Sequence, residues 1–119
     1  KIAKQKNINI INIIKDKTKL INLYDENNIM ILPSYTEGYP MVILEALSRL
    51  RPVIVFKEIE HVVENRKGIF VSKRNPQSFV DTTKFIMTNY IKIQKDIEQN
   101  NFPLEKDMFL QISSIVKNN

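Results

Sequence analysis

The sequence has no cysteine and only one histidine, His61. Without cysteine the chain can form neither a disulfide nor a thiolate nucleophile, and it suits a reducing compartment. One histidine cannot complete a zinc site, which takes about four ligands. An Asp-x-Asp metal motif is also missing, so we expect no metal and no cofactor. We favour a structural role for His61 on a short helix, with contact to a ligand as the alternative.

Long apolar runs and targeting signals are lacking as well. No stretch approaches the roughly 20 apolar residues that span a bilayer, and no signal peptide is visible. The chain has 119 residues and begins at Lys1 rather than at a methionine. We therefore expect one cytoplasmic domain over residues 1–119, and a fragment from which earlier strands and helices are missing.

Acidic residues are fewer than basic ones, and the net charge is +5. This excess would suit an anionic partner, such as a nucleotide phosphate, a lipid surface or nucleic acid. Most of it comes from lysines dispersed along the sequence, however, and dispersed lysines typically form a solvated surface. We favour the solvated surface. The 43% of hydrophobic residues is ordinary for a globular domain.

What the sequence does contain is an alternation of short apolar runs with helical patterns. The apolar runs are predicted as strands at Ile8–Ile14, Ile29–Leu32, Val53–Phe56 and Ile69–Ser72. Helices are predicted from Asp16 past Tyr24, from Pro40 to about Leu50, at Ile59–Arg66, from Asn75 to about Gln99, and from Pro103 to about Val116. The helix predicted from Asn75 to about Gln99 carries an apolar stripe that is expected to pack in the core, at Phe79, Ile86, Tyr90, Ile93 and Ile97.

Strands that alternate with helices indicate a parallel sheet with crossover helices. Strands that are apolar throughout indicate burial on both faces of that sheet. We therefore predict an α/β fold, with a Rossmann-like parallel sheet and helices on both faces.

The loop after the second predicted strand is the best candidate for a binding site, because open parallel sheets bind ligands at the carboxyl ends of their strands. It leads into a helix at Pro40 and contains Gly38, one of only two glycines in the chain. A helix N-terminus offers free N–H groups and a favourable dipole to a phosphate. Gly38 would either let a ligand approach the backbone or make a tight turn, and the residues leave both open.

Glu45 falls on the polar side of the helix that follows this loop, together with Ser48 and Arg49. Periodicity alone favours a solvent-exposed ion pair between Glu45 and Arg49, worth about 0.3–0.5 kcal/mol. A carboxylate that faces a cleft can instead accept hydrogen bonds from two vicinal hydroxyls, such as those of a ribose.

These residues lie in a context that resembles a known family. Glu37-Gly38-Tyr39-Pro40 followed by Leu44-Glu45-Ala46-Leu47 looks like the Glu, seven residues, Glu motif of retaining family 4 glycosyltransferases. The strand-to-loop segment before the motif and the strands after its helix are similar too, at Ile31–Pro40, Arg51–Val55 and Gly68–Val71. The resemblance runs from about Leu20 to the C-terminus. It implies the C-terminal half of a GT-B fold, truncated at its N-terminal end.

The resemblance also implies a role for each motif residue. Glu45 would bind the ribose of a nucleotide-diphosphate sugar, and Glu37 would contact the donor sugar as the catalytic glutamate. The backbone would hold the diphosphate and the sugar at Gly38, Tyr39, Met41 and Val42. Tyr39 could stack on the donor or only cover the loop.

The family transfers its sugar with retention to a hydroxyl acceptor, here a sugar or a lipid-linked glycan, and generally needs no metal. Surface glycan or lipopolysaccharide synthesis is the process that the resemblance implies. We expect no nucleic acid as a partner. Peripheral association with the inner face of the membrane would occur through the missing N-terminal domain.

Two departures from the family pattern bear on the site. Lys57–His61 stands where the family commonly has a glycine pair and a proline, in a loop that faces the donor. The family's basic pair for the diphosphate has no counterpart here and would precede Lys1, so the fragment alone is expected to be inactive. The alternatives are a GT-B fold nucleotide-sugar epimerase and a non-catalytic module that binds a nucleotide sugar or nucleic acid.

Overall fold

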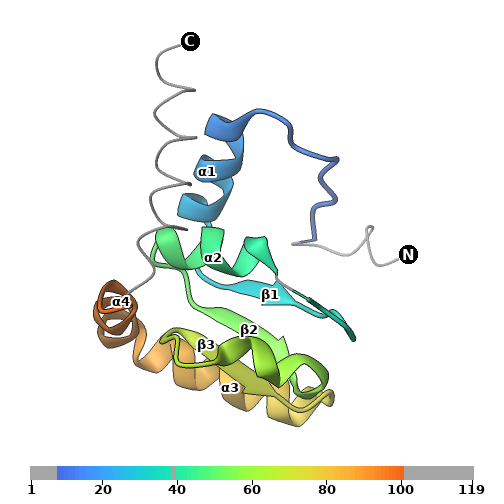
Figure 1. Ribbon diagram of the computed structural model, residues 1–119, viewed down its shortest axis with the longest axis vertical. Coiled ribbons are helices and arrows are strands. Elements are labelled where there is room, and N and C mark those ends of the chain that lie inside the picture. Colours follow the sequence, from blue (N-terminus) through green and yellow to red (C-terminus); the bar gives the residue numbers. More distant parts are fainter. Residues whose placement is uncertain (1–7, 39, 101–119) are drawn as a thin grey trace.

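The computed structural model describes residues 8–38 and 40–100 (Figure 1). Within these residues a three-stranded sheet is formed by β1 (Met30–Leu32), β2 (Val53–Phe56) and β3 (Ile69–Ser72). The helices that surround it are α1 (Lys17–Glu26), α2 (Met41–Ser48), α3 (Pro76–Thr88), α4 (Tyr90–Glu98) and the 3₁₀ helix η2 (Lys57–Val63).

The sheet is parallel throughout, in the order β1-β2-β3. Ile31 lies opposite Ile54, which in turn lies opposite Phe70. Parallel neighbours need a crossover connection, and α2 provides one from β1 to β2 while η2 provides one from β2 to β3. The central strand β2 is buried along its whole length, as its apolar sequence predicts. The predicted α/β fold with a parallel sheet is confirmed.

Helices cover both faces of the sheet, with α2 on one side and α3 on the other (Figure 1). Phe56 of β2 stacks on Phe79 of α3, with the ring centroids 6.0 Å apart. Successive side chains of a strand point to opposite faces, so Val55 points away from α3 and joins Leu47 of α2 in the same buried cluster. This two-sided packing is the Rossmann-like arrangement expected from the sequence.

Two helices begin where their capping residues predict. The Asp16 side chain accepts a hydrogen bond of 2.9 Å from the N–H of Thr18 at the start of α1. The Asn75 side chain accepts one of 2.8 Å from the N–H of Ser78, and Pro76 takes the first position of α3. Both caps satisfy N–H groups that a helix leaves unpaired in its first turn.

The strand predicted at Ile8–Ile14 is wrong. The structure places no strand there, and Ile10 and Ile13 are 76% and 90% exposed. The strand preference of isoleucine reflects packing on a half-buried, paired surface. None of the described strands pairs with this segment, so it lacks the surface that would fix it as a strand. The described sheet therefore has three strands where four were predicted.

The helix predicted from Asn75 to Gln99 is divided in two at Asn89. The side chain of Asn89 donates to the carbonyl of Phe85 at 2.8 Å, and its N–H lies 3.2 Å from the carbonyl of Ile86. Asparagine side chains compete in this way with helical hydrogen bonds, so α3 ends here and α4 begins. The predicted apolar stripe still packs in the core, where Ile86, Ile93 and Ile97 are buried.

Smaller differences concern the other predicted helices. The segment predicted as a helix at Ile59–Arg66 is a 3₁₀ helix that begins earlier and ends at Val63. The helix predicted from Pro103 lies outside the described residues. Gly68 turns the chain into β3 with a φ of +97°, a conformation that favours glycine.

Candidate functional site

The loop of residues 33–40 lies at the carboxyl end of β1 and leads into α2. Because the three strands run parallel, the segments that follow β2 and β3 lie at the same edge of the sheet. Each of these two segments contributes a side chain that holds the loop in place. These side chains are His61 of η2 and Arg74 of the β3–α3 connection.

His61 contacts the loop at Glu37. Its Nε2 atom lies 3.0 Å from the carbonyl oxygen of Glu37. Because a carbonyl oxygen can only accept, the imidazole must carry a proton on Nε2 and donate it. The side chain of Glu37 is half-buried, and no described residue forms a recorded hydrogen bond with its carboxylate. His61 thus fixes the backbone of Glu37, which is a structural role of the kind we favoured.

Arg74 holds the same loop from the connection between β3 and α3. Its guanidinium carbon lies 3.9 Å from the centroid of the Tyr35 ring and 4.5 Å from that of Phe56. Nη2 donates to the carbonyl of Ser34 at 3.3 Å and pairs with Glu58 at 3.1 Å. A backbone hydrogen bond lowers the pKa of Glu58 most, and the hydrogen bond from Arg74 lowers it further. Arg74 therefore joins the segments that follow all three strands.

Sequence reasoning did not single out Arg74. Its only signal is its place directly after a predicted strand, at the edge where parallel sheets bind ligands. The departure from the family pattern at Lys57–His61 also gains an explanation, because this segment supplies Glu58 to Arg74 and His61 to the loop.

The first turn of α2 presents backbone donors. Its N-cap residue, Pro40, makes no side-chain capping bond, and no hydrogen bond to a described residue is recorded from the N–H of Met41 or Val42. Free N–H groups at a helix N-terminus favour an anion. Gly38 does not adopt a positive φ, and a β-carbon added to it would meet nothing within 4 Å. The backbone at Gly38 is thus open to a ligand, and its turn does not require glycine.

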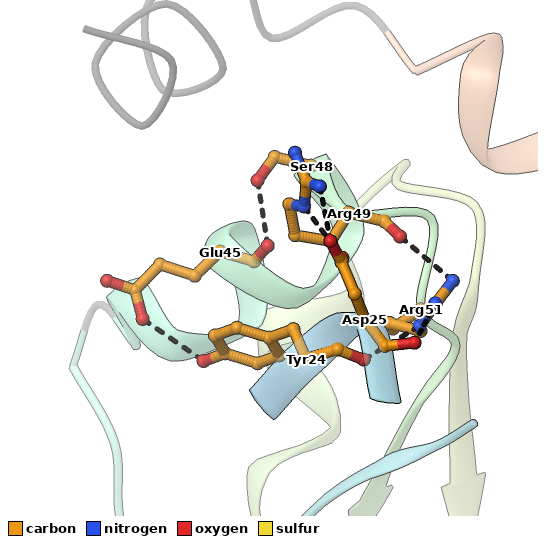
Figure 2. Close-up of polar contacts among 6 residues, drawn as sticks. All are labelled: Tyr24, Asp25, Glu45, Ser48, Arg49 and Arg51. Carbon is orange, nitrogen blue, oxygen red and sulfur yellow. Dashed lines mark hydrogen bonds and ion pairs between the residues drawn. The ribbon is translucent and has the colours of Figure 1, made fainter. Parts of the chain in front are cut away.

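Glu45 lies in the second turn of α2, and its partner comes from α1 rather than from its own helix (Figure 2). Its Oε1 atom accepts a hydrogen bond of 3.1 Å from the hydroxyl of Tyr24. The ion pair between Glu45 and Arg49, which helical periodicity alone favours, does not form. Arg49 binds Asp25 instead, with Nε donating to Oδ1 at 2.9 Å. Asp25 offers both carboxylate oxygens to the guanidinium, a bidentate geometry that Glu45 does not provide.

The hydroxyl of Tyr24 keeps its proton at neutral pH. Burial raises the pKa of Tyr24, and the charge of Glu45 and the hydrogen bond to it raise the pKa further. The backbone beside it is fixed by Arg51, whose Nε donates to the carbonyl of Tyr24 at 2.8 Å and whose Nη2 donates to that of Asp25 at 2.7 Å. The C-terminal end of α1 is therefore held firmly against α2 (Figure 2).

The two motif glutamates are held by different parts of the fold. Glu37 is held through its backbone by η2, whereas Glu45 is held through its side chain by α1. No contact between the two carboxylates is recorded. Gly38, Met41 and Val42 lie between them along the chain, and Tyr39 lies outside the described residues.

Two features are absent from the described residues, 8–38 and 40–100. No group of three or more His, Cys, Asp or Glu side chains is placed to hold a metal ion there. None of the helices in this part of the chain has the length and apolarity that crossing a membrane requires.

Comparison with known proteins places the chain in a family. The model of the family described as glycosyl transferases group 1 matches residues 1–115, so the chain belongs to the group 1 glycosyl transferases. An uncharacterized glycosyltransferase of Haemophilus influenzae is 33% identical over 55 residues, which are 44% of this chain and 16% of that protein. The chain thus matches about a sixth of the length of this relative. No solved structure matches the chain at a significant level.

Proposed function

We propose that this chain is the donor-binding part of a retaining glycosyltransferase, and that it binds a nucleotide-diphosphate sugar at the start of α2. One observation carries the proposal. The N–H groups of Met41 and Val42, which have no recorded partner among the described residues, lie between Glu37 and Glu45 along the chain. The carboxylate of Glu37 precedes these N–H groups in the chain, and the carboxylate of Glu45 follows them.

The N-terminus of α2 and the two glutamates suit different parts of the donor. The helix N-terminus would stabilise the diphosphate, including the charge that grows on it as the glycosidic bond breaks. Glu45 would accept hydrogen bonds from the ribose hydroxyls, since a carboxylate offers about four acceptor sites. Glu37 would lie beside the sugar, with the backbone of Gly38 and Tyr39 close to it.

The same proposal extends to the reaction. The sugar passes with retention to a hydroxyl of a sugar or a lipid-linked glycan, and the resemblance to family 4 enzymes supports surface glycan or lipopolysaccharide synthesis as the process. Residues 1–119 act as a donor-binding unit, and acceptor recognition belongs to other parts of the enzyme. Donor binding needs no metal, so EDTA leaves the donor affinity unchanged.

Steady-state kinetics of two variants in the intact enzyme test the proposal. Glu45→Ala removes bonds to a ribose that does not change during the reaction, so it raises the donor KM and spares kcat. Glu37→Gln keeps the shape but removes the charge beside a sugar that becomes positive, so it lowers kcat more than it raises KM.

Glu98→Ala is the matched control, because Glu98 is an exposed glutamate of α4, outside the elements that carry the proposed donor site. It should turn over like the parent. If Glu37→Gln and Glu45→Ala do so as well, the assignment of the donor site fails.

A further inference from the structure

Glu45 is the one proposed donor ligand whose side chain is fixed by another helix. A glutamate on a helix surface is free to sample several rotamers, and ordering it costs conformational entropy. Here one oxygen of the carboxylate, Oε1, accepts the hydroxyl of Tyr24 at 3.1 Å. The other oxygen points away from Tyr24 (Figure 2), and no described group is recorded in a hydrogen bond with it.

The tyrosine is itself held rigidly. Its backbone carbonyl accepts from Arg51 at 2.8 Å, and the next residue, Asp25, binds Arg49, the C-cap residue of the helix that carries Glu45. The hydroxyl also lies 3.5 Å from the carbonyl of Val42, at the long limit for a hydrogen bond. Tyr24 thus approaches α2 from a helix that is anchored at two further points, to the C-cap of α2 at Arg49 and to the α2–β2 connection at Arg51.

We propose that Tyr24 is a positioning residue, whose hydroxyl fixes the Glu45 carboxylate so that its second oxygen meets the ribose hydroxyls of a bound nucleotide. This role rests on the proposed function of Glu45. The phenol remains a donor across the neutral range, because its pKa is raised by burial and by Glu45. A donor that keeps its proton holds Oε1 in one place and leaves the remaining acceptor sites of the carboxylate to the ligand.

Ribose discrimination gives a readout that a purely structural role would not change. The affinities of UDP, ADP and GDP, and of their 2′-deoxy counterparts, are measured for the full chain, and the tightest pair is carried forward. The variants are Tyr24→Phe, which removes only the hydroxyl, Glu45→Ala, and the double variant. Tyr90→Phe is the matched control, since Tyr90 also loses its hydroxyl bonds, 2.7 Å to the carbonyl of Asn28 and one with Arg51, but none of them is to Glu45.

Tyr24→Phe is expected to weaken the ribonucleotide by about three- to ten-fold, the effect of one lost hydrogen bond, and to weaken the 2′-deoxy analogue less. In the Glu45→Ala background the same change should have no further effect, because the residue it positions is gone. Tyr90→Phe should bind like the parent, and melting curves confirm that each variant is folded.

Two results overturn the positioning role alone. The first is parent-like affinity of Tyr24→Phe while Glu45→Ala binds weakly. The second is an equal loss of affinity in Tyr24→Phe for the ribonucleotide and for its 2′-deoxy analogue. Parent-like binding by Glu45→Ala overturns the proposed function of Glu45, and the role of Tyr24 with it.

Discussion

Arg49 and Asp25 form a bidentate ion pair that ties α2 to the end of α1. The pair directs Arg49, the C-cap residue of α2, away from Glu45, which lies four residues earlier in that helix. Glu45 is thereby left to the neutral hydroxyl of Tyr24. A carboxylate neutralised by arginine would be a poorer acceptor for a ligand, so the choice of partner bears on the site as well as on the packing of the two helices.

Asp25→Asn should lower the free energy of unfolding by about 0.2–1 kcal/mol, the usual range for a solvent-exposed ion pair. Both side chains are about a third exposed, so the larger values of buried pairs do not apply. Urea unfolding at neutral pH measures the loss. Asp81→Asn is the control, because Asp81 is exposed and accepts only a neutral hydrogen bond, 2.8 Å from Gln77.

The same pair predicts a pH dependence. The hydrogen bonds from Arg49 lower the pKa of Asp25 in the folded chain. A carboxyl with a lowered pKa stabilises the fold above its unfolded pKa of about 3.9, and this contribution is lost as the pH falls through the folded pKa. The stability difference between the parent and Asp25→Asn should therefore be full at pH 7 and vanish in acid. A stability difference of the same size at pH 7 and in acid would contradict the ion pair.

His61→Ala should loosen the loop that carries Glu37. Removal of the 3.0 Å contact to the Glu37 carbonyl is expected to speed amide hydrogen exchange at residues 34–38. His61→Gln offers an amide N–H in a similar place and should restore part of the protection. Unchanged exchange in His61→Ala would show that the contact does not hold the loop.

Gly68→Ala should be among the more damaging single changes in the core. Gly68 has a φ of +97°, and a β-carbon there would overlap Ile97 and come within 3.0 Å of Leu47. The backbone strain costs about 1–2 kcal/mol and overpacking about 1–3 kcal/mol, so we expect a loss of roughly 2–5 kcal/mol in the free energy of unfolding. Ile97→Val together with Gly68→Ala should recover part of the overpacking term. A loss below about 1 kcal/mol would mean that α4 does not pack as described.

The sequence predicted the parts of the fold that depend on neighbouring residues. The three strands followed from short apolar runs, and the starts of α1 and α3 followed from Asp16 and Asn75 because caps act within one turn. The prediction failed at Ile8–Ile14, where apolar character alone does not supply a pairing partner. It also missed the break at Asn89, where a side chain bonds its own helix.

The candidate site likewise has features that the sequence predicted and features that it did not. The loop, its glycine and the two glutamates could be found from the sequence, because the motif is continuous and the family resemblance is local. Their partners could not, since Tyr24 lies 21 residues before Glu45, and Arg74 lies 40 residues after Ser34. Such contacts are set by the crossing of helices and the order of strands. Helical spacing instead suggested Arg49 as the partner of Glu45, and tertiary packing gave Arg49 to Asp25.

The central claim is that Glu45 binds the ribose of a nucleotide donor. Calorimetric titration of the full chain with the tightest of UDP, ADP and GDP tests it most directly, with Glu45→Ala beside the control Glu98→Ala. The account predicts that Glu45→Ala weakens binding by about ten- to a hundred-fold, the value of a lost hydrogen bond to a charged group, and that Glu98→Ala binds like the parent. Equal affinities for the parent and Glu45→Ala would contradict it.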